Sequence, residues 1–377
     1  MNPPVTLARR GPIGLILIDH PPVNALSQAV RAGLVEAVAT LDADATFEAG
    51  LLLCAGRTFI AGADISEFGQ SPQPPHLPDV VSRLEASDKL LVAAIHGTAL
   101  GGGYEVALGC HYRCALRDAR IGFPEVKLGI LPGAGGTQRA PRLAGIERAL
   151  ELILNGEPIG AVQAHQWRLI DELIEGNLES GALGYTQRLL AQRARLRRVR
   201  DLAVPQADSA RAAIDNARTR IARQARGQIA PERAIQAVEA TLTLPIDDGL
   251  KLERRLFEEC RESSQSRALR HLFFAEREAA RVPDLPAGAE PLPIATVGIV
   301  GAGTMGAGIA LSCLNAGLQV RMIEQNAEAL ERGRTQVASS LDASVQKGRL
   351  RADQRDQRLA RLQPALALES LGDADLI

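Results

Sequence analysis

Residues 295–324 read ATVGIVGAGTMGAGIALSCLNAGLQVRMIE, and this segment constrains the fold more than any other part of the chain. A short apolar run leads into three glycines with the spacing Gly-x-Gly-x-x-Gly. A helical stretch follows, and Gly317 then precedes a second apolar run that ends in Glu324. A strand, a glycine turn, a helix and a second strand form one parallel α/β unit. The pattern predicts the beginning of a Rossmann domain over residues 294–377.

The same segment predicts a dinucleotide site, with a purely structural turn as the alternative. Gly301 allows a tight turn, Gly303 lets the backbone approach a pyrophosphate, and Gly306 lets the helix pack on the strand. An acid at the end of the second strand would bind ribose hydroxyls and disfavour a 2′-phosphate, so NAD is expected rather than NADP. The predicted cofactor-binding residues are Gly301, Gly303, Thr304, Met305, Gly306 and Glu324.

The composition argues against several classes of partner and site. The 43 basic and 44 acidic side chains leave a net charge of −1, which gives no electrostatic reason to expect nucleic acid or an anionic membrane. No apolar run approaches the roughly 20 residues that span a bilayer, and the N-terminus lacks a signal-peptide core. We therefore expect a cytoplasmic protein without a transmembrane segment. Five cysteines without a CxxC pair indicate reduced, mostly buried thiols rather than a metal site.

The first part of the chain alternates strand and helix patterns, as a layered α/β domain does. Apolar runs predict strands at 13–18, 49–55 and 90–95, and helical spacing of apolar residues predicts helices at 27–41 and 81–90.

Beyond about residue 140 the pattern is mostly helical. One long helix is predicted over 246–281, followed by a proline-rich linker. The arginines within 188–200 are interpreted as a solvated helix face, with phosphate binding as the alternative. The predicted domains are 1–190, a helical region and linker at 191–293, and 294–377.

Two segments place small residues where a strand ends. They are Ile60-Ala61-Gly62-Ala63-Asp64-Ile65 and the stretch from His96 to Glu105, which contains three consecutive glycines. Small residues let backbone N–H groups approach a ligand closely, and Gly102 lies at a helix start, where N–H groups lack internal partners. Two such donors on a thioester oxygen would stabilise an enolate, and losing one typically costs about 2.7–4 kcal/mol.

Two glutamates near these segments are candidates for acid–base chemistry. Glu105 follows the three glycines, and Glu125 comes twenty residues later after Phe-Pro. Two carboxyls facing one substrate can divide the work, one ionised and polarising water, the other protonated and donating to carbon. The alternatives are a helix-start charge at Glu105 and a turn residue at Glu125.

Three long segments resemble the enoyl-CoA hydratase/isomerase (crotonase) family in the family's order. They are AGADI, GTALGGGYEVAL and RIGFPEVKLGILPGAGGTQR. The resemblance implies a ClpP-like ββα spiral fold and an acyl-CoA thioester substrate. It implies that the Ala63 and Gly102 N–H groups form the oxyanion hole and that Ala61 and Ile65 line the coenzyme A adenine pocket.

The resemblance also implies the roles of the two glutamates. Glu105 would activate the water that attacks C3, and Glu125 would deliver the proton to C2. Members that act only as isomerases usually lack the first glutamate, so its presence favours hydration of trans-2-enoyl-CoA, with isomerase side activity through Glu125. Isomerase-only, thioesterase and non-catalytic acyl-CoA-binding roles are the alternatives. Arg168 stands where the family usually has Gly, and we expect an altered or strained turn there.

The order of the whole chain resembles the multifunctional β-oxidation enzymes, in which a crotonase domain, a linker helix and a 3-hydroxyacyl-CoA dehydrogenase follow one another. That resemblance implies a thiolase subunit as a possible partner. The last histidine is His271, which precedes the Rossmann segment, so no histidine is available there as the base of a dehydrogenase. The sequence is therefore interpreted as truncated, with the dehydrogenase residues beyond its end.

Overall fold

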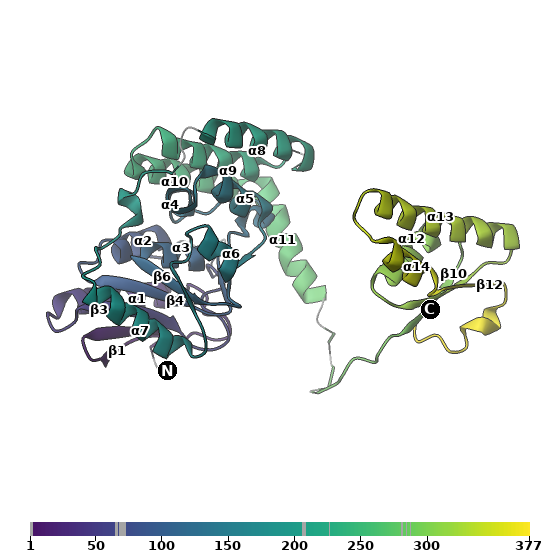
Figure 1. The fold of residues 1–377 in the computed structure, drawn as a ribbon, viewed down its shortest axis with the longest axis horizontal. Helices are drawn as coiled ribbons and strands as arrows, with labels where there is room; N and C mark the ends of the chain where they lie inside the picture. The colour runs from purple at the N-terminus through teal and green to yellow at the C-terminus, as the bar shows by residue number, and fades with distance from the viewer. Residues whose placement is uncertain are drawn as a thin grey trace. The chain divides into compact units, whose positions relative to one another are not determined.

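The computed structural model describes residues 3–64, 67, 73–205, 209–225, 227–279, 282–283, 285–286 and 288–377. The chain forms two compact units, residues 1–281 and 282–377 (Figure 1). The predicted division near residue 190 falls inside the first unit and stays a prediction.

The first unit is organised around a six-stranded sheet. Its order is β1 (Val5–Arg10), β2 (Ile13–Ile18), β3 (Ala49–Cys54), β4 (Leu90–Ile95), β6 (Tyr112–Leu116) and β9 (Glu172–Ile174). β1 pairs antiparallel with β2, and the other pairs are parallel. Every residue of β3 and β4 is buried, as expected for parallel strands that are covered on both faces.

Helices cover both faces of this sheet. One face packs on a large core shared with α1 (Gln28–Ala43), α2 (Leu77–Glu85) and α3 (Gly102–Gly109). The other face packs against α7 (Leu178–Ala191), which runs along the sheet in Figure 1. α2 begins four residues before the predicted start, because Pro78 occupies its first turn, where a missing N–H costs nothing.

A smaller sheet positions the loops of the candidate site. It contains β5 (Thr98–Leu100), β7 (Arg120–Gly122) and β8 (Ile159–Gly160), with β5 and β7 parallel. The ends of β5 and β7 therefore lie side by side. From them the chain continues into α3 and into the 3₁₀ helix η2 (Glu125–Leu128).

Most of the remaining helices of the first unit form a second layer, drawn at the top of the unit in Figure 1. They are α4 (Gly136–Ala144), α5 (Ile146–Asn155), α8 (Ala210–Gln224), α9 (Ile229–Glu239) and α10 (Ile246–Glu262). Two further helices lie lower in the same view: α6 (Ala161–Gln166), drawn beside α3, and α11 (Ser264–Ala279), which runs down from this layer. Short 3₁₀ helices, η3 (Val199–Asp201) and η5 (Ala240–Leu242), connect some of them.

The prediction of one helix over 246–281 is wrong. The chain breaks at Ser263, whose backbone is extended at φ −67° and ψ 153°. The Ser263 hydroxyl accepts the N–H of Ser266 at 3.0 Å, which satisfies a free donor at the start of α11. Serine favours such helix starts because its side chain competes with the helical backbone for hydrogen bonds.

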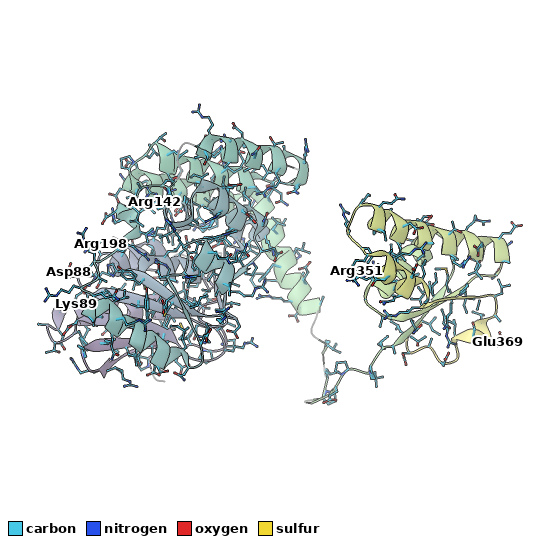
Figure 2. All side chains as sticks on the ribbon, viewed as in Figure 1. Asp88, Lys89, Arg142, Arg198, Arg351 and Glu369 are labelled. Atoms are coloured by element: carbon cyan, nitrogen blue, oxygen red, sulfur yellow. The ribbon has the colours of Figure 1, made fainter. Side chains whose placement is uncertain are left out.

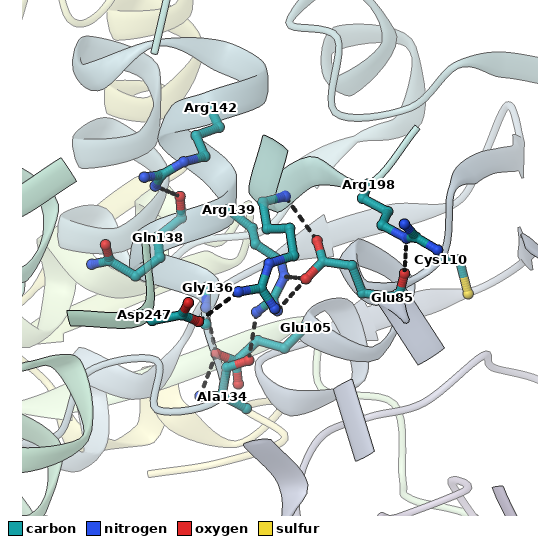
Figure 3. Close-up of polar contacts among 12 residues, drawn as sticks. Glu85, Glu105, Cys110, Ala134, Gly136, Gln138, Arg139, Arg142, Arg198 and Asp247 are labelled. Atoms are coloured by element: carbon teal, nitrogen blue, oxygen red, sulfur yellow. Dashed lines mark hydrogen bonds and ion pairs between the residues drawn. The ribbon is translucent and has the colours of Figure 1, made fainter. Parts of the chain in front are cut away.

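The arginine-rich segment is mostly not a helix face, contrary to the interpretation above. α7 ends at Ala191, and its neighbouring arginines make specific contacts. Arg197 pairs with Asp171 at 2.6 Å. Arg198, which is labelled on the first unit in Figure 2, donates to the Glu85 carbonyl at 3.1 Å (Figure 3). These contacts tie the segment to the body of the first unit.

The second unit has a parallel sheet of β10 (Thr296–Val300), β11 (Gln319–Ile323) and β12 (Leu362–Ala365), in that order. Its helices are α12 (Thr304–Asn315), α13 (Ala327–Gln346) and α14 (Ala352–Leu359), with the 3₁₀ helix η6 (Leu368–Leu371). Leu376 forms a parallel bridge with Val297, so the last residues lie on the free side of β10. This is the strand order of the first half of a Rossmann domain.

In the described parts of both units, no helix combines the length and the apolar character needed to cross a bilayer. Four of the cysteines are buried, and Cys313 is half-buried. Among the same residues, no group of three or more His, Cys, Asp or Glu side chains is arranged to hold a metal ion.

Candidate active site

Two backbone segments meet beside the start of α3. The Leu100 N–H donates to the Ile60 carbonyl at 3.0 Å, and the Leu26 N–H donates to the Gly62 carbonyl at 3.0 Å. The first bond holds Ile60 against β5, and the second holds Gly62 against Leu26. A Cβ built on Gly102 would lie 3.5 Å from the Ala63 nitrogen. The structure thus brings the two predicted oxyanion donors into one place.

Among the described residues, neither the Ala63 N–H nor the Gly102 N–H has an acceptor within the chain. Gly102 is the first residue of α3, and Gly101 before it has a φ of +53°, which favours glycine. A side chain at Gly102 would meet the Leu77 Cδ2 atom at 2.7 Å. The N–H groups at this helix start favour negative charge.

Glu105 is held in a fixed orientation in the first turn of α3. Its Oε1 atom accepts the Ala134 N–H at 2.8 Å and the Gly136 N–H at 2.7 Å (Figure 3). The side chain is 2% exposed. Burial raises the pKa of Glu105 to about 6, against the opposing effect of the two N–H groups and of the Arg139 guanidinium. Because both bonds go to Oε1, the other oxygen is left for a substrate or water.

Glu125 is the first residue of η2, shortly after β7, and lies next to the glycine turn that precedes α3. A Cβ on Gly101 would be 2.6 Å from its Oε1 atom. Its Oε2 atom is buried and has no hydrogen-bond partner among the described residues. Burial raises the pKa of Glu125 well above its ordinary value, and the Glu105 carboxylate adds to this rise. Glu125 is therefore suited to carry a proton, while Glu105 ionises more readily.

A third buried carboxyl, Glu253 of α10, was not predicted. It accepts the Gly135 N–H at 2.6 Å, the Thr137 N–H at 3.0 Å and the Thr137 hydroxyl. Burial, followed by the Glu105 carboxylate, raises its pKa to about 8. The sequence carried a signal for it, namely the helical spacing of positions 249, 253, 256 and 260. This spacing places the four residues on one face of α10, and that face is buried. A glutamate on such a stripe marks a buried acid.

One guanidinium lies within this group of acids. Arg139 is 1% exposed and donates to the Glu85 carboxylate at 2.7 Å (Figure 3). Its charge lowers the pKa values of Glu105 and Glu253 without cancelling the effect of burial. Since Glu85 already pairs with Arg139, the other buried carboxyls cannot all be ionised cheaply, and Glu125 and Glu253 hold their protons more firmly than Glu105.

The two predicted coenzyme A contacts are only partly described. The Ala61 N–H donates to the Val23 carbonyl at 3.1 Å, and its side chain is half-buried. Ile65 lies outside the described residues. The adenine pocket stays a prediction.

The glycine turn of the second unit has the geometry of a phosphate-binding loop. Gly301 has a φ of +103°, which favours glycine. A Cβ on Gly306 would be 1.8 Å from the Gly301 carbonyl oxygen, so a side chain there would disrupt the turn. A Cβ on Gly303 would meet no atom within 4 Å, which leaves open space above the loop. These features fit the close approach of a pyrophosphate.

Glu324 lies at the same turn. Its carboxylate accepts the Ala302 N–H at 3.0 Å and the Gln325 N–H at 2.9 Å, and these bonds lower its pKa. Thr304 and Met305 are exposed at the start of α12. The predicted dinucleotide residues are thus grouped around one loop and one helix start.

Comparisons with known families assign both units. The family described as "Enoyl-CoA hydratase/isomerase" matches residues 9–226, more than half of the 377 residues. The family described as "3-hydroxyacyl-CoA dehydrogenase, NAD binding domain" matches residues 296–377.

Relatives from several organisms match nearly the whole chain. A peroxisomal bifunctional enzyme of Danio rerio is 38% identical over 370 residues, which is 97% of this chain and 51% of that protein. A peroxisomal fatty acid beta-oxidation multifunctional protein of Oryza sativa is 33% identical over 383 residues, 97% of this chain and 52% of that protein. The chain spans about half the length of the curated relatives it matches.

Solved structures share the predicted fold. Carnitinyl-CoA hydratase from Mycobacterium avium is 30% identical, with a TM-score of 0.54, and the match covers 75% of this chain and all of that one. An enoyl-CoA hydratase/isomerase from Pseudoalteromonas atlantica is 20% identical, has a TM-score of 0.54 and covers 75% of this chain and 99% of that one, which supports the fold alone. The predicted crotonase fold is confirmed. The chain belongs to the enoyl-CoA hydratase/isomerase family, and its C-terminal segment belongs to the NAD-binding domain of 3-hydroxyacyl-CoA dehydrogenases.

Proposed function

We propose that the first unit hydrates trans-2-enoyl-CoA to 3-hydroxyacyl-CoA in fatty-acid β-oxidation. The observation that supports this most directly is the placement of Glu105 and Glu125 beside the free N–H groups of Ala63 and Gly102. The name of the Oryza sativa relative, a fatty acid beta-oxidation multifunctional protein, points to the same pathway.

The proposed reaction divides the work among these groups. The Ala63 and Gly102 N–H groups hydrogen-bond to the thioester oxygen and stabilise the negative charge that develops as C3 is attacked. Ionised Glu105 orients a water molecule and accepts one of its protons while the oxygen bonds to C3. Protonated Glu125 donates its proton to C2. Proton exchange with solvent then restores both carboxyls.

Isomerase side activity is a second candidate for the same site. The Glu125 Oε2 atom has no hydrogen-bond partner among the described residues, so it is free to move a proton between two carbons of a 3-enoyl-CoA. This reaction needs one acid–base group rather than two. The activity would therefore depend on Glu125 and much less on Glu105.

The second unit would bind NAD through the turn from Gly301 to Gly306, the exposed Thr304 and Met305, and Glu324. Bound NAD would supply a hydride acceptor for a 3-hydroxyacyl thioester. The Gly303 backbone would lie against the pyrophosphate, and the Glu324 carboxylate would face the ribose hydroxyls. No residue of this chain is assigned to proton transfer in that reaction.

The location and partners are open to direct tests. The named relatives are peroxisomal or glyoxysomal, which differs from the cytoplasmic location predicted from the sequence. Imaging of the tagged chain in its own cells distinguishes the two. The predicted thiolase subunit is tested by co-purification.

Enzyme assays on the purified chain test the proposed activity. Crotonyl-CoA, a longer 2-enoyl-CoA and a 3-enoyl-CoA are supplied in parallel, and NADH formation is followed with NAD present. We expect hydration, with Glu105→Gln and Glu125→Gln each reducing kcat at least about 100-fold while the proteins stay folded. Near-normal hydration by either variant, or acyl-CoA binding without turnover in the unaltered chain, contradicts the proposal.

A further inference from the structure

Two buried carboxyl groups hold the loop at residues 134–137, and successive N–H groups of the loop donate alternately to one and to the other. Ala134 and Gly136 donate to Glu105 Oε1, at 2.8 and 2.7 Å. Gly135 and Thr137 donate to Glu253, at 2.6 and 3.0 Å. Any displacement of the loop away from Glu253 therefore also displaces the two donors that hold Glu105.

Helix α10 packs on this loop closely enough to prevent such a displacement. A Cβ on Gly133 would lie 2.5 Å from the Phe257 ring, and one on Gly249 would lie 2.2 Å from the Gln138 side-chain oxygen. Gly135 has a φ of +102°, and a Cβ there would be 1.7 Å from Arg139 Nη1. The loop is thus built from small residues against a helix that carries Glu253.

We propose that Glu253 is a positioning residue for hydration, which holds the 134–137 loop so that its other N–H groups orient the Glu105 carboxylate. The proposal rests on the function proposed above. Glu253 is 1% exposed and acts from behind the loop rather than on the substrate. It lies outside residues 9–226, which match the hydratase family, so α10 supplies a part of the site that the matched segment lacks.

Glu253 also affects the charge balance of the site. The titratable and charged groups around it are Glu105, Glu125 and Arg139, and Arg139 is in turn paired with Glu85. Once Glu253 ionises, above its pKa of about 8, its negative charge contributes to the raised pKa of Glu125. Removing that charge lowers the pKa of Glu125, so the proton needed at C2 is lost at a lower pH. The alkaline limb of the kcat profile then moves to lower pH.

Glu253→Gln tests the proposal in the full chain, with crotonyl-CoA as substrate. Glutamine keeps the shape but turns an amide group toward N–H donors. We expect kcat to fall about 10- to 100-fold with KM changed less than about 3-fold, since the misplaced group acts in the transition state. The alkaline limb should move to lower pH.

Glu258→Gln is the matched control on the same helix. Its side chain is 43% exposed and pairs with Arg254, so kcat and the pH profile should stay those of the unaltered chain. Circular dichroism and thermal melting establish that both variants are folded.

A second variant covers the case in which Glu253→Gln does not fold. Thr137→Val removes only the hydroxyl that donates to Glu253 and keeps the backbone N–H. We expect a smaller loss of kcat than in Glu253→Gln, and the alkaline limb of the kcat profile should again move to lower pH.

Three results overturn the proposal. The first is a normal kcat in the folded Glu253→Gln variant. If that variant does not fold, a normal kcat in Thr137→Val counts in the same way. The second is a kcat loss with an unmoved alkaline limb, which indicates a merely structural role. The third is an unaltered chain that does not hydrate crotonyl-CoA, which rejects the proposed function together with this inference.

Discussion

Arg139 and Glu85 form an ion pair at 2.7 Å in which the two side chains are 1% and 2% exposed. The pair links the end of α2 to α4, and the Glu85 Oε1 atom also accepts the Arg200 N–H at 2.9 Å. It leaves the guanidinium beside the acids of the candidate site but already neutralised. The strength of this pair therefore affects both the stability of the first unit and the charge around Glu105.

Glu85→Ala should destabilise the first unit strongly. It leaves the Arg139 charge buried without its partner, and breaking such a pair typically costs about 3–5 kcal/mol. Urea unfolding followed by circular dichroism measures the change. Glu172→Ala, which breaks the exposed pair with Arg188, is the control and should cost less than about 1 kcal/mol. Equal losses in the two variants contradict the argument.

The pH dependence of hydration should show an acid limb near the pKa of Glu105, which is raised to about 6. Glu105 must be ionised to polarise water, so kcat/KM should fall as the pH drops through that value. The profile is measured with crotonyl-CoA in buffers of constant ionic strength. Activity that stays flat down to the ordinary titration range of glutamate contradicts the role assigned to Glu105.

Glu125→Gln should make the first unit more stable at neutral pH. Burial raises the folded-state pKa of Glu125 above its unfolded value. The stability it contributes is therefore fully present below the unfolded pKa and is lost as the pH rises through the folded pKa. The Glu125→Gln variant has no group that loses stability in this way. Its Tm should therefore exceed that of the unaltered chain at neutral pH and equal it in acid. A lower Tm at neutral pH contradicts the pKa direction.

Arg168→Gly should stabilise the first unit. Arg168 is exposed and has a φ of +63°, as expected from the departure from the family's glycine. This left-handed conformation costs a non-glycine residue about 1 kcal/mol. Arg168→Ala removes the same side chain but keeps the strain, so it should match the unaltered chain. Equal Tm values for the glycine and alanine variants exclude backbone strain.

Gly306→Ala should weaken NAD binding and destabilise the second unit, because the new Cβ would lie 1.8 Å from the Gly301 carbonyl oxygen. Gly308→Ala on the same helix meets open space and should stabilise α12 by up to about 1 kcal/mol. Calorimetric titration with NAD is expected to show at least about a tenfold loss of affinity for the first variant only. Tight binding by Gly306→Ala contradicts the loop assignment.

Local patterns in the sequence determined most of the elements. The buried strands at 13–18 and 90–95 and the strand–turn–helix–strand of 295–324 are confirmed, because continuous apolar runs and glycine turns act over a few residues. The crotonase fold, by contrast, was implied by the resemblance of three segments to the family and not by local patterns. The positive φ at Arg168 also followed from one substituted position.

Only the tertiary structure decided how the candidate site is assembled. The Ser263 break depends on one hydroxyl that competes with the helical backbone, a choice that periodicity does not reveal. The helical spacing of α10 marks Glu253 as a buried position but does not reveal its partners, because Gly135 and Thr137 are more than 100 residues away. Burial of a carboxylate is favourable only when distant N–H groups satisfy it, and those groups meet it only after the chain has folded.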